Sequence, residues 1–181
     1  LDEATPGAPN GTYTDFIKDN DGTGNDNPVA AVGTVNGAQL FDGANTEINV
    51  LADRSFDWQS DESFSIEFWV KIDNGIPLNN EVVIGRDDAG TSLHWWVGIT
   101  GGAGTATFVL RDTTGAGAAI AGTTNIADGA WHHVVAVRDN STDDNFLYVD
   151  GVQEATANQN HTAGFGSATA ALNIGWLNLD T

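Results

Sequence analysis

Apolar and polar residues alternate along most of this chain, and stretches with a helical period are nearly absent. The clearest case is the segment 64–73, in which every second residue is apolar, from Phe64 to Ile72, and the residues between are mostly polar. Successive side chains of a β-strand point to opposite faces, so this spacing gathers the apolar residues on one face. The pattern therefore predicts a half-buried strand over 64–73.

Other short segments rich in Val, Ile, Phe, Trp and Thr predict further strands. These segments are 39–41, 47–51, 81–86, 93–100, 105–111, 131–138, 145–149 and 171–177. Asp-Gly, Asn-Gly and Gly-Gly pairs lie between them, and such pairs are typical of tight turns. Many short strands separated by turns of this kind indicate a two-sheet antiparallel sandwich or a barrel.

Two stretches are specified less clearly. Residues 18–28 are polar without an apolar anchor, and they predict either a long surface loop or a metal-holding loop. Residues 112–124 are rich in Gly, Ala and Thr and predict either a flexible connection or an edge strand of weak register. Neither stretch has the character of a domain boundary, so residues 1–181 are expected to form one domain, as a fragment or module of a larger chain.

Composition and charge exclude several classes of protein. The chain has 25 Asp and Glu against 6 Lys and Arg, a formal net charge of −19, and so few cations cannot form a nucleic-acid-binding face. The apolar runs are far shorter than the ~20 residues of a membrane-spanning helix. The chain has no Cys, which excludes disulfides and thiolate chemistry. Its carboxylates either serve solubility alone or include oxygen ligands for Ca²⁺.

Four segments, taken in order, resemble a known family. The first is G-A-Q-L-F-D-G at 37–43 and the second is F-S-I-E-F-W-V-K at 64–71. The third is D-G-A-W-H-H-V-V-A-V-R at 128–138 and the fourth is L-Y-V-D-G at 147–151. Together they closely resemble the laminin-G-like jelly-roll domains of the concanavalin A-like lectin/glucanase superfamily. The resemblance implies an all-β fold, a two-sheet antiparallel jelly-roll sandwich.

The resemblance extends to L-D-E at 1–3 and to L-N-I-G at 172–175. The family usually continues with a closing strand of the type F-x-G-x-I-D-E-V, which the sequence does not contain after residue 175. Either that strand was trimmed with the fragment, or another segment or a neighbouring subunit supplies it. An unpaired sheet edge is a template for strand addition, so the second case implies self-association or contact with neighbouring domains.

The resemblance also implies a Ca²⁺ site on the outer surface, near the start of the chain and the F-D-G loop. The matching residues are Asp2 or Glu3 together with Asp42, Gly43 and Asn45. The family's carboxylate from the closing strand is missing, so Asp180 or water would have to replace it. Calcium takes six to eight oxygen ligands, and one carboxylate with several carbonyls can suffice.

A second calcium candidate follows from the residues themselves. Asp19 and Asp21 lie in a loop whose alternating Asx and Gly residues are typical of the start of a calcium loop. The loop lacks the bidentate Glu and the flanking helices of an EF-hand. A solvated surface loop explains the same pattern.

Tryptophan residues suggest a sugar-binding face, because the C–H faces of sugars stack on aromatic rings. Trp95 and Trp96 are adjacent on a predicted strand and must point to opposite faces, so we expect one buried ring and one exposed ring. The predicted glycan-binding set is completed by three further residues: His94, Trp69 and Trp176. The alternative for each ring is packing in a core that contains no Met.

Catalysis is not expected. Hydrolases of the superfamily carry an E-x-D-x-x-E arrangement, and none of the six Glu residues has that spacing. The resemblance therefore implies a non-catalytic, extracellular or cell-surface module for calcium-supported binding of a glycan or another surface ligand in adhesion. The alternative is a structural subunit of an extracellular filament or surface layer, assembled by strand or edge contacts.

Overall fold

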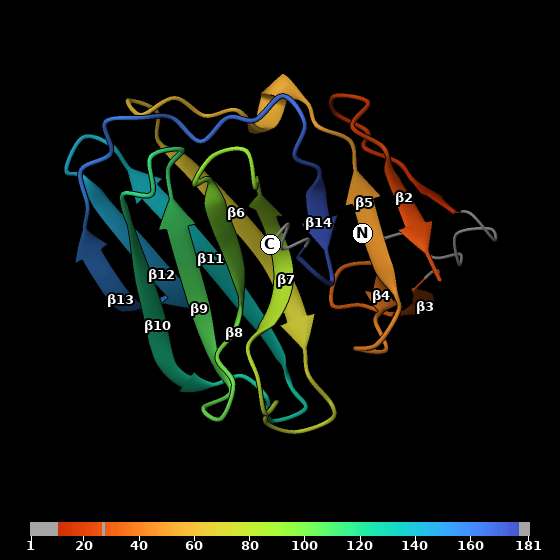
Figure 1. Ribbon diagram of the computed structural model, residues 1–181. Coiled ribbons are helices and arrows are strands. Elements are labelled where there is room, and N and C mark those ends of the chain that lie inside the picture. Colours follow the sequence, from red (N-terminus) through yellow and green to blue (C-terminus); the bar gives the residue numbers. More distant parts are fainter. Residues whose placement is uncertain (1–10, 27, 178–181) are drawn as a thin grey trace.

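Residues 11–26 and 28–177 are described by a computed structural model. They form two stacked antiparallel sheets, with the larger sheet in front of the smaller one in Figure 1, and a separate hairpin. In sheet order, the large sheet contains β1 (Thr12–Tyr13), β2 (Gly22–Asn25), β5 (Glu47–Val50), β14 (Leu172–Ile174), β7 (Glu81–Asp87), β8 (His94–Ile99), β9 (Thr105–Arg111) and β10 (Gly117–Asn125).

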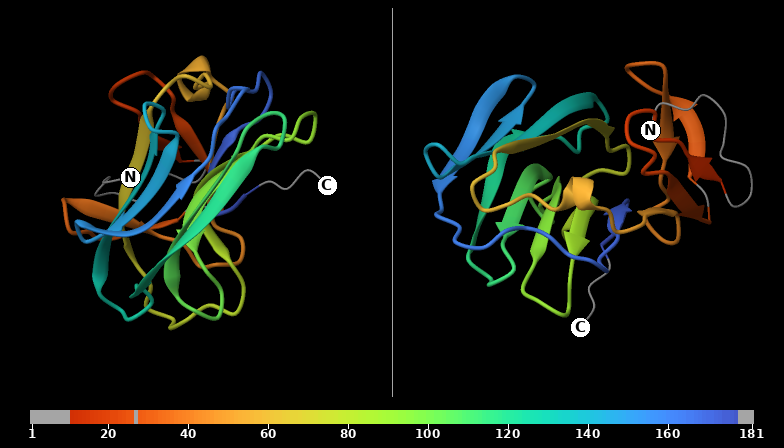
Figure 2. Two further views of the ribbon diagram at one scale, coloured as in Figure 1. Left: turned by 90° about the vertical axis from the view of Figure 1, so that its left-hand side faces the viewer. Right: turned by 90° about the horizontal axis from the view of Figure 1, so that it is seen from above.

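The small sheet lies behind β7 to β10 and covers only part of the large one. In sheet order it contains β13 (Val152–Asn158), β12 (Asp144–Val149), β11 (Trp131–Asp139) and β6 (Phe64–Lys71). The large sheet continues past it through β14, β5 and β2, next to the hairpin of β3 (Val29–Val32) and β4 (Gly37–Leu40) (Figure 2). The described helical structure is one 3₁₀ turn, η1 (Arg54–Phe56), and no described helix is long and apolar enough to cross a membrane.

The predicted all-β, two-sheet antiparallel sandwich is confirmed. Every predicted strand overlaps an observed one, and β9 has the predicted bounds. The stretch 112–124 contains the edge strand β10, which was one of its two interpretations. The interpretation of 18–28 as a loop is wrong at its centre, where β2 pairs with β5. Gly22 allows this pairing without an apolar side chain of its own, because a Cβ there would lie 2.6 Å from Ile48 Cγ2.

The core lies between the two sheets and is built from the alternating apolar positions. From the small sheet, Val134, Ala136 and Leu147 are fully buried. From the large sheet they meet Val97 and Phe108, which are buried to the same degree. Burying such side chains stabilises the fold by about 1.5–3 kcal/mol each, so the period-2 pattern accounts for most of the architecture.

The inward side chains of β6 are less well covered than those of its neighbour β11. Phe64, Ile66, Phe68 and Val70 pack on the core but stay half-buried. Within the described ranges β6 pairs with β11 alone, and no described strand pairs with its other edge. An exposed edge of this kind can accept a further strand.

The opposite edge of the sandwich is closed by a side chain. The register between β9 and β10 shifts between Ala121 and Asn125, which frees backbone donors on β10. Glu154 of β13 accepts the N–H groups of Thr123 at 2.8 Å and Thr124 at 3.1 Å. This carboxylate therefore joins the edges of the two sheets and blocks strand addition at the bulge.

A buried arginine holds the loops at the top of the sandwich. Arg86 of β7 is fully buried, and its guanidinium donates to Asp57 Oδ1 at 2.8 Å and to the backbone carbonyl of Phe56 at 2.9 Å. It also donates to the carbonyls of Ser167 at 2.6 Å and Ala170 at 3.0 Å. These groups belong to η1 and to the segment that crosses the top of Figure 1 before β14, so one guanidinium ties both segments to β7.

The crossing segment is anchored by further buried contacts. His161 and Asp112 are both buried, and Nδ1 of His161 lies 3.1 Å from Asp112 Oδ2. Phe165 is fully buried and contacts the ring of His161 edge-on at 4.9 Å. These contacts hold the irregular segment between β13 and β14 in place. The chain then enters β14, which lies between β5 and β7.

At the other end, His132 clamps two turns together. Its Nδ1 lies 2.8 Å from Asp150 Oδ2 and its Nε2 lies 3.1 Å from Asp128 Oδ1. Burial lowers the pKa of His132, but the hydrogen bonds to Asp150 and Asp128 outweigh burial and raise the pKa above its usual value. The protonated ring can donate to both carboxylates at once.

This clamp predicts a pH-dependent contribution to stability. Because the folded pKa is raised, His132 stabilises the fold fully below its unfolded pKa, and that contribution disappears as the pH rises through the folded pKa. We expect His132→Gln to lower the melting temperature more at about pH 5.5 than at about pH 8.5. His133→Gln, the next residue on the opposite face, is the control. An equal loss at both pH values would contradict the clamp.

Candidate functional site

Three polar side chains form a row on the outer face of the large sheet, the face turned away from the core. Asp87 of β7 is paired with His94 of β8, and His94 is paired with Arg111 of β9. Directly paired residues place their side chains on the same face of a sheet. The antiparallel register therefore assembles an acid, an imidazole and a guanidinium side by side.

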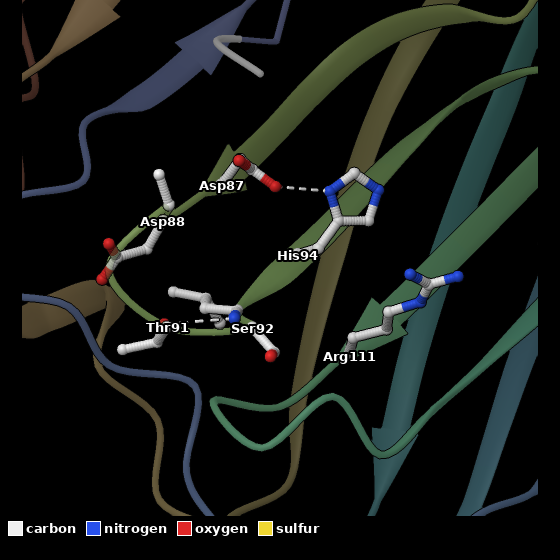
Figure 3. A pocket seen from close by; sticks show the side chains of 8 residues that line it. Asp87, Asp88, Thr91, Ser92, His94 and Arg111 are labelled. Carbon is white, nitrogen blue, oxygen red and sulfur yellow. Dashed lines mark hydrogen bonds and ion pairs between the residues drawn. The ribbon is translucent and has the colours of Figure 1, made fainter. Parts of the chain in front are cut away.

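Hydrogen bonds fix the orientation of the central histidine (Figure 3). His94 Nδ1 lies 2.6 Å from Asp87 Oδ1, and His94 Nε2 lies 3.1 Å from the indole nitrogen of Trp96. An indole N–H is a donor only, so Nε2 must accept and the ring proton must sit on Nδ1. The chain of bonds runs from Trp96 through His94 to Asp87 and uses one oxygen of that carboxylate.

The row borders an open hollow of about 360 Å³ at the end of the sheet. We call it the β7–β8 hollow; it is lined by Asp87, Asp88, Ala89, Thr91, Ser92, Leu93, His94 and Arg111. The turn between β7 and β8 is held by hydrogen bonds from Gly90 N–H to Asp88 at 2.8 Å and from Ser92 N–H to Thr113 O at 3.1 Å. The side chains that line the hollow thus present hydroxyl, carboxylate and guanidinium groups, and hydrogen bonds hold the turn at its border in place.

The expectation of one exposed ring at Trp95 and Trp96 is wrong, because both rings are buried. Trp95 is 1% exposed and faces the core, whereas Trp96 is 7% exposed on the outer face. Gly85 lies opposite Trp96, and a Cβ there would be 2.7 Å from the Cβ of Trp96 and 3.0 Å from Leu177 Cδ1. The missing side chain at Gly85 therefore leaves room for Trp96 and Leu177. Trp96 therefore supports His94 from below, and neither ring is available for stacking on a sugar.

The other two predicted tryptophans lie away from the hollow. Trp176 is half-buried, and its N–H donates to Asn49 Oδ1 at 2.9 Å, which also accepts from Asn173 at 2.8 Å. Trp69 is 45% exposed on the outer face of the small sheet and stacks on His133 at 5.0 Å. The predicted glycan-binding residues are thus divided between the two sheets, and their contact with a ligand stays a prediction.

The predicted calcium ligands are only partly within the described residues. Asp2, Glu3 and Asp180 lie outside them. Asp42 Oδ1 accepts the N–H groups of Ala44, Asn45 and Thr46 at 2.9 to 3.1 Å. The hydrogen bonds from Ala44, Asn45 and Thr46 hold the pKa of Asp42 far below its usual range. This carboxylate caps its own turn and leaves one oxygen for other ligands.

The second calcium loop is organised in a similar way. Asp21 Oδ1 accepts the N–H of Asp15 at 2.9 Å, and Asp19 is exposed with a positive φ of 58°. Within 11–26 and 28–177, no three His, Asp or Glu side chains converge on one point. Calcium can also be held by one carboxylate with several carbonyl oxygens, so calcium binding stays a prediction.

The described glutamates are mostly engaged in the fold. Glu62 accepts the N–H of Gln59 at 2.6 Å, and Glu47 accepts the side-chain amide groups of Asn25 and Asn49. Glu154 closes the β10 edge, as described above, and Glu67 lies 3.6 Å from His133. A retaining glycosidase needs two free carboxyl groups about 5–5.5 Å apart across a scissile bond. These side chains instead serve hydrogen bonds within and between the sheets.

Asp87 and Arg111 are functional candidates that sequence reasoning missed. Asp87 belongs to a turn-like Asp-Asp pair, and Arg111 ends a strand, so neither carries a motif. The sequence does contain a signal for Asp87: a hairpin whose turn is residues 88–93 places Asp87 opposite His94. The pairing of β9 with β8, which adds Arg111, depends on turn geometry that composition does not determine.

Two stacked antiparallel sheets, of which the larger carries a polar hollow on its outer face, define a β-sandwich. The chain belongs to the concanavalin A-like lectin/glucanases superfamily, because the Laminin_G_3 family model matches residues 42–180. No curated protein sequence matches the chain closely. The family assignment confirms the resemblance inferred from the four ordered segments.

Solved structures show the same fold. The binding domain of Paraclostridial Mosquitocidal Protein 1 matches with a TM-score of 0.73 at 14% identity, over 88% of this chain and 40% of that one. Domain 4 of AbnA, a GH43 extracellular arabinanase from Geobacillus stearothermophilus solved with arabinotriose, has a TM-score of 0.56 at 18% identity, over 84% and 68%. The Ruminococcus gnavus IT-sialidase CBM40 has a TM-score of 0.53 at 15% identity, over 68% and 66%.

This chain therefore spans 40% of the length of the mosquitocidal binding domain and 66% of the sialidase module. The sialidase module was also solved with α2,3-sialyllactose, with a TM-score of 0.51 at 16% identity over 65% of this chain and 71% of that one. At such identities the likeness shows the fold alone, and function has to be argued from the site.

The hydrogen-bond chain makes a prediction about the tautomer of His94. In imidazole ¹H–¹⁵N correlation spectra at neutral pH, we expect His94 to carry its proton on Nδ1, because Nε2 accepts from Trp96. Trp96→Phe keeps an aromatic ring but removes the donor, and this variant should keep the proton on Nδ1, because the Asp87 carboxylate still accepts it there. A proton on Nε2 in the unmodified protein would contradict the assigned orientation.

Proposed function

We propose that this chain is a non-catalytic glycan-binding module of an extracellular or cell-surface protein and that the β7–β8 hollow binds the glycan. The observation that carries the proposal is the in-register row of Asp87, His94 and Arg111 beside an open, polar hollow. A sugar presents hydroxyl groups in fixed directions, and such a row offers an acceptor, an oriented ring and a set of donors to meet them.

The comparisons support a binding role. Two of the matching folds, the arabinanase domain and the sialidase module, were solved with oligosaccharides, and the arabinanase is described as extracellular. The described glutamates of this chain are largely occupied by structural hydrogen bonds, which favours binding over hydrolysis. Adhesion through a surface glycan is the cellular role that we infer, and calcium would act on it from the Asp42 loop rather than in the hollow.

A structural role is the second candidate, and the free edge of β6 favours it. The inward side chains of β6 are half-buried, and in the described part of the chain the strand has a partner on one side only. A subunit of a filament or surface layer would use this edge to accept a strand from its neighbour. Such a subunit would show no preference among glycans, so the glycan experiment separates the two roles.

The proposed site predicts the outcome of a glycan-array screen followed by calorimetric titration. The arrays are run once with Ca²⁺ and once with a chelator. We expect at least one oligosaccharide to bind without being cleaved. Asp87→Ala should weaken its binding by about tenfold or more, because a hydrogen bond to a charged group is lost. Trp69→Ala, on the other sheet, is the matched control and should leave the affinity unchanged.

Thermal melts of both variants establish that they fold, so that a loss of binding is local. Binding that is lost in Trp69→Ala but retained in Asp87→Ala would place the site on the small sheet and overturn the assignment to the hollow. A complete lack of glycan binding, together with assembly into oligomers, would favour the structural role. Release of reducing sugar from a bound oligosaccharide would contradict the non-catalytic part of the proposal.

A further inference from the structure

Arg111 differs from the other cationic side chains of this acidic chain. Three cations are held in ion pairs: Arg86 with Asp57 at 2.8 Å, Arg138 with Asp143 at 2.8 Å, and Lys71 with Asp73 at 3.0 Å. Two more act on Asp53, whose pKa is lowered first by hydrogen bonds from Ser55 and then by the charges of Lys18 and Arg54. In 11–26 and 28–177, Lys18, Arg54 and Arg111 have no carboxylate within ion-pair distance, and of these three only Arg111 lines the β7–β8 hollow.

Within the described residues, Arg111 has no carboxylate partner, although the chain carries 25 acids against 6 bases. The neighbouring carboxylates are engaged elsewhere. Asp87 Oδ1 is bound to His94, Asp88 Oδ1 accepts from Gly90, and Asp112 faces inward.

The inward carboxylate of Asp112 is fully satisfied without Arg111. Its Oδ1 accepts from the N–H and hydroxyl of Thr114 and from the N–H of Ala116, and its Oδ2 faces His161. Burial raises the pKa of Asp112, but the hydrogen bonds from Thr114 and His161 outweigh burial and lower it. The negative charge of Asp112, the next residue after Arg111, is therefore compensated by its own partners on the core side of the sheet. It forms no ion pair with the Arg111 guanidinium on the outer side.

The backbone next to Arg111 gives its side chain a defined place. Gly117 of β10 is paired with Arg111, and a Cβ at this glycine would lie 2.5 Å from Arg111 Cγ. The missing side chain lets the methylene groups of Arg111 lie against the neighbouring strand. On the other side stands His94, whose ring is fixed by Asp87 and Trp96 (Figure 3). The guanidinium is thus positioned at the rim of the hollow while it stays exposed.

The chemistry of this arrangement favours a carboxylate. A guanidinium presents its N–H groups in a planar fork that matches the two oxygens of a carboxylate, and the paired hydrogen bonds are charge-assisted. The opposite side of the hollow offers the hydroxyl groups of Thr91 and Ser92 and the second oxygen of Asp87, which suit sugar hydroxyls. A ligand that fills both sides carries an acid at one end and hydroxyl groups at the other.

We propose that Arg111 makes the β7–β8 hollow selective for glycans that carry a carboxylate, namely sialic acid or uronic acid residues. The proposal rests on the glycan-binding function inferred above and adds the class of sugar. Repulsion from distant carboxylates is screened beyond about 10 Å at ordinary ionic strength. Asp87 and Asp88 line the hollow itself, so the carboxylate of the ligand is expected at the Arg111 end and its hydroxyl groups at the Asp87 end. The selectivity is therefore expected to persist in moderate salt.

The test compares matched ligands by calorimetric titration of the whole chain. α2,3-Sialyllactose is paired with lactose, and trigalacturonate is paired with its own neutral methyl ester. We expect each acidic probe to bind about tenfold or more tightly than its neutral counterpart. Arg111→Gln should remove this difference, and Arg111→Lys, which keeps the charge but loses the fork, should restore part of it. Asp87→Ala should weaken both members of each pair.

The outcomes separate the selectivity from the underlying function. Neutral probes that bind as well as acidic ones, with Arg111→Gln unchanged and Asp87→Ala weakened, would overturn the selectivity and leave glycan binding intact. A lack of binding by all four probes and by the glycan array would overturn both. Thermal melts of Arg111→Gln guard against misfolding, and retention of its lactose affinity confirms that the hollow is intact.

Discussion

The buried guanidinium of Arg86 is the interaction on which the candidate site depends. Its donors are shared among the carboxylate of Asp57 and three backbone carbonyls from two segments that are distant in sequence. A buried charge costs several kcal/mol unless its hydrogen bonds are satisfied, so the end of β7 cannot shift without losing several of them. Asp87 is the next residue and points to the opposite face. The same contacts therefore fix the place where its carboxylate meets His94.

The two outer faces of the sandwich have different chemical characters as a result. On the large sheet, Trp96 is buried beneath its neighbours beside Gly85, and it supports a polar row that ends in the free cation Arg111. On the small sheet, Trp69 stacks on His133 and remains exposed. A polar hollow suits ligands recognised by charge and hydrogen bonds, whereas a flat aromatic face suits stacking. The outer face of the large sheet therefore has the character that the proposed acidic sugar requires.

Period-2 alternation was enough to predict the two sheets, because burial of one strand face is a local property of sequences such as 64–71. It failed at β2, where the side chain of Ile48 from β5 lies against Gly22 and the strand itself carries no apolar signal. It also failed at Trp96, because the alternation rule assumes that the outer face of a sheet meets water. The site was predicted only at His94, since Asp87 and Arg111 join it through strand register, which is a tertiary property.

Chemical-shift mapping tests the central claim most directly, because it locates the ligand without altering the protein. In ¹H–¹⁵N spectra recorded during titration with α2,3-sialyllactose, the account predicts that the largest changes occur at the backbone amides of Asp87, His94 and Arg111 and at the Arg111 side-chain Nε–H. Small or absent changes are predicted on the small sheet. Changes confined to Trp69, His133 and their neighbours would contradict the account, because they would place recognition on the opposite face of the sandwich.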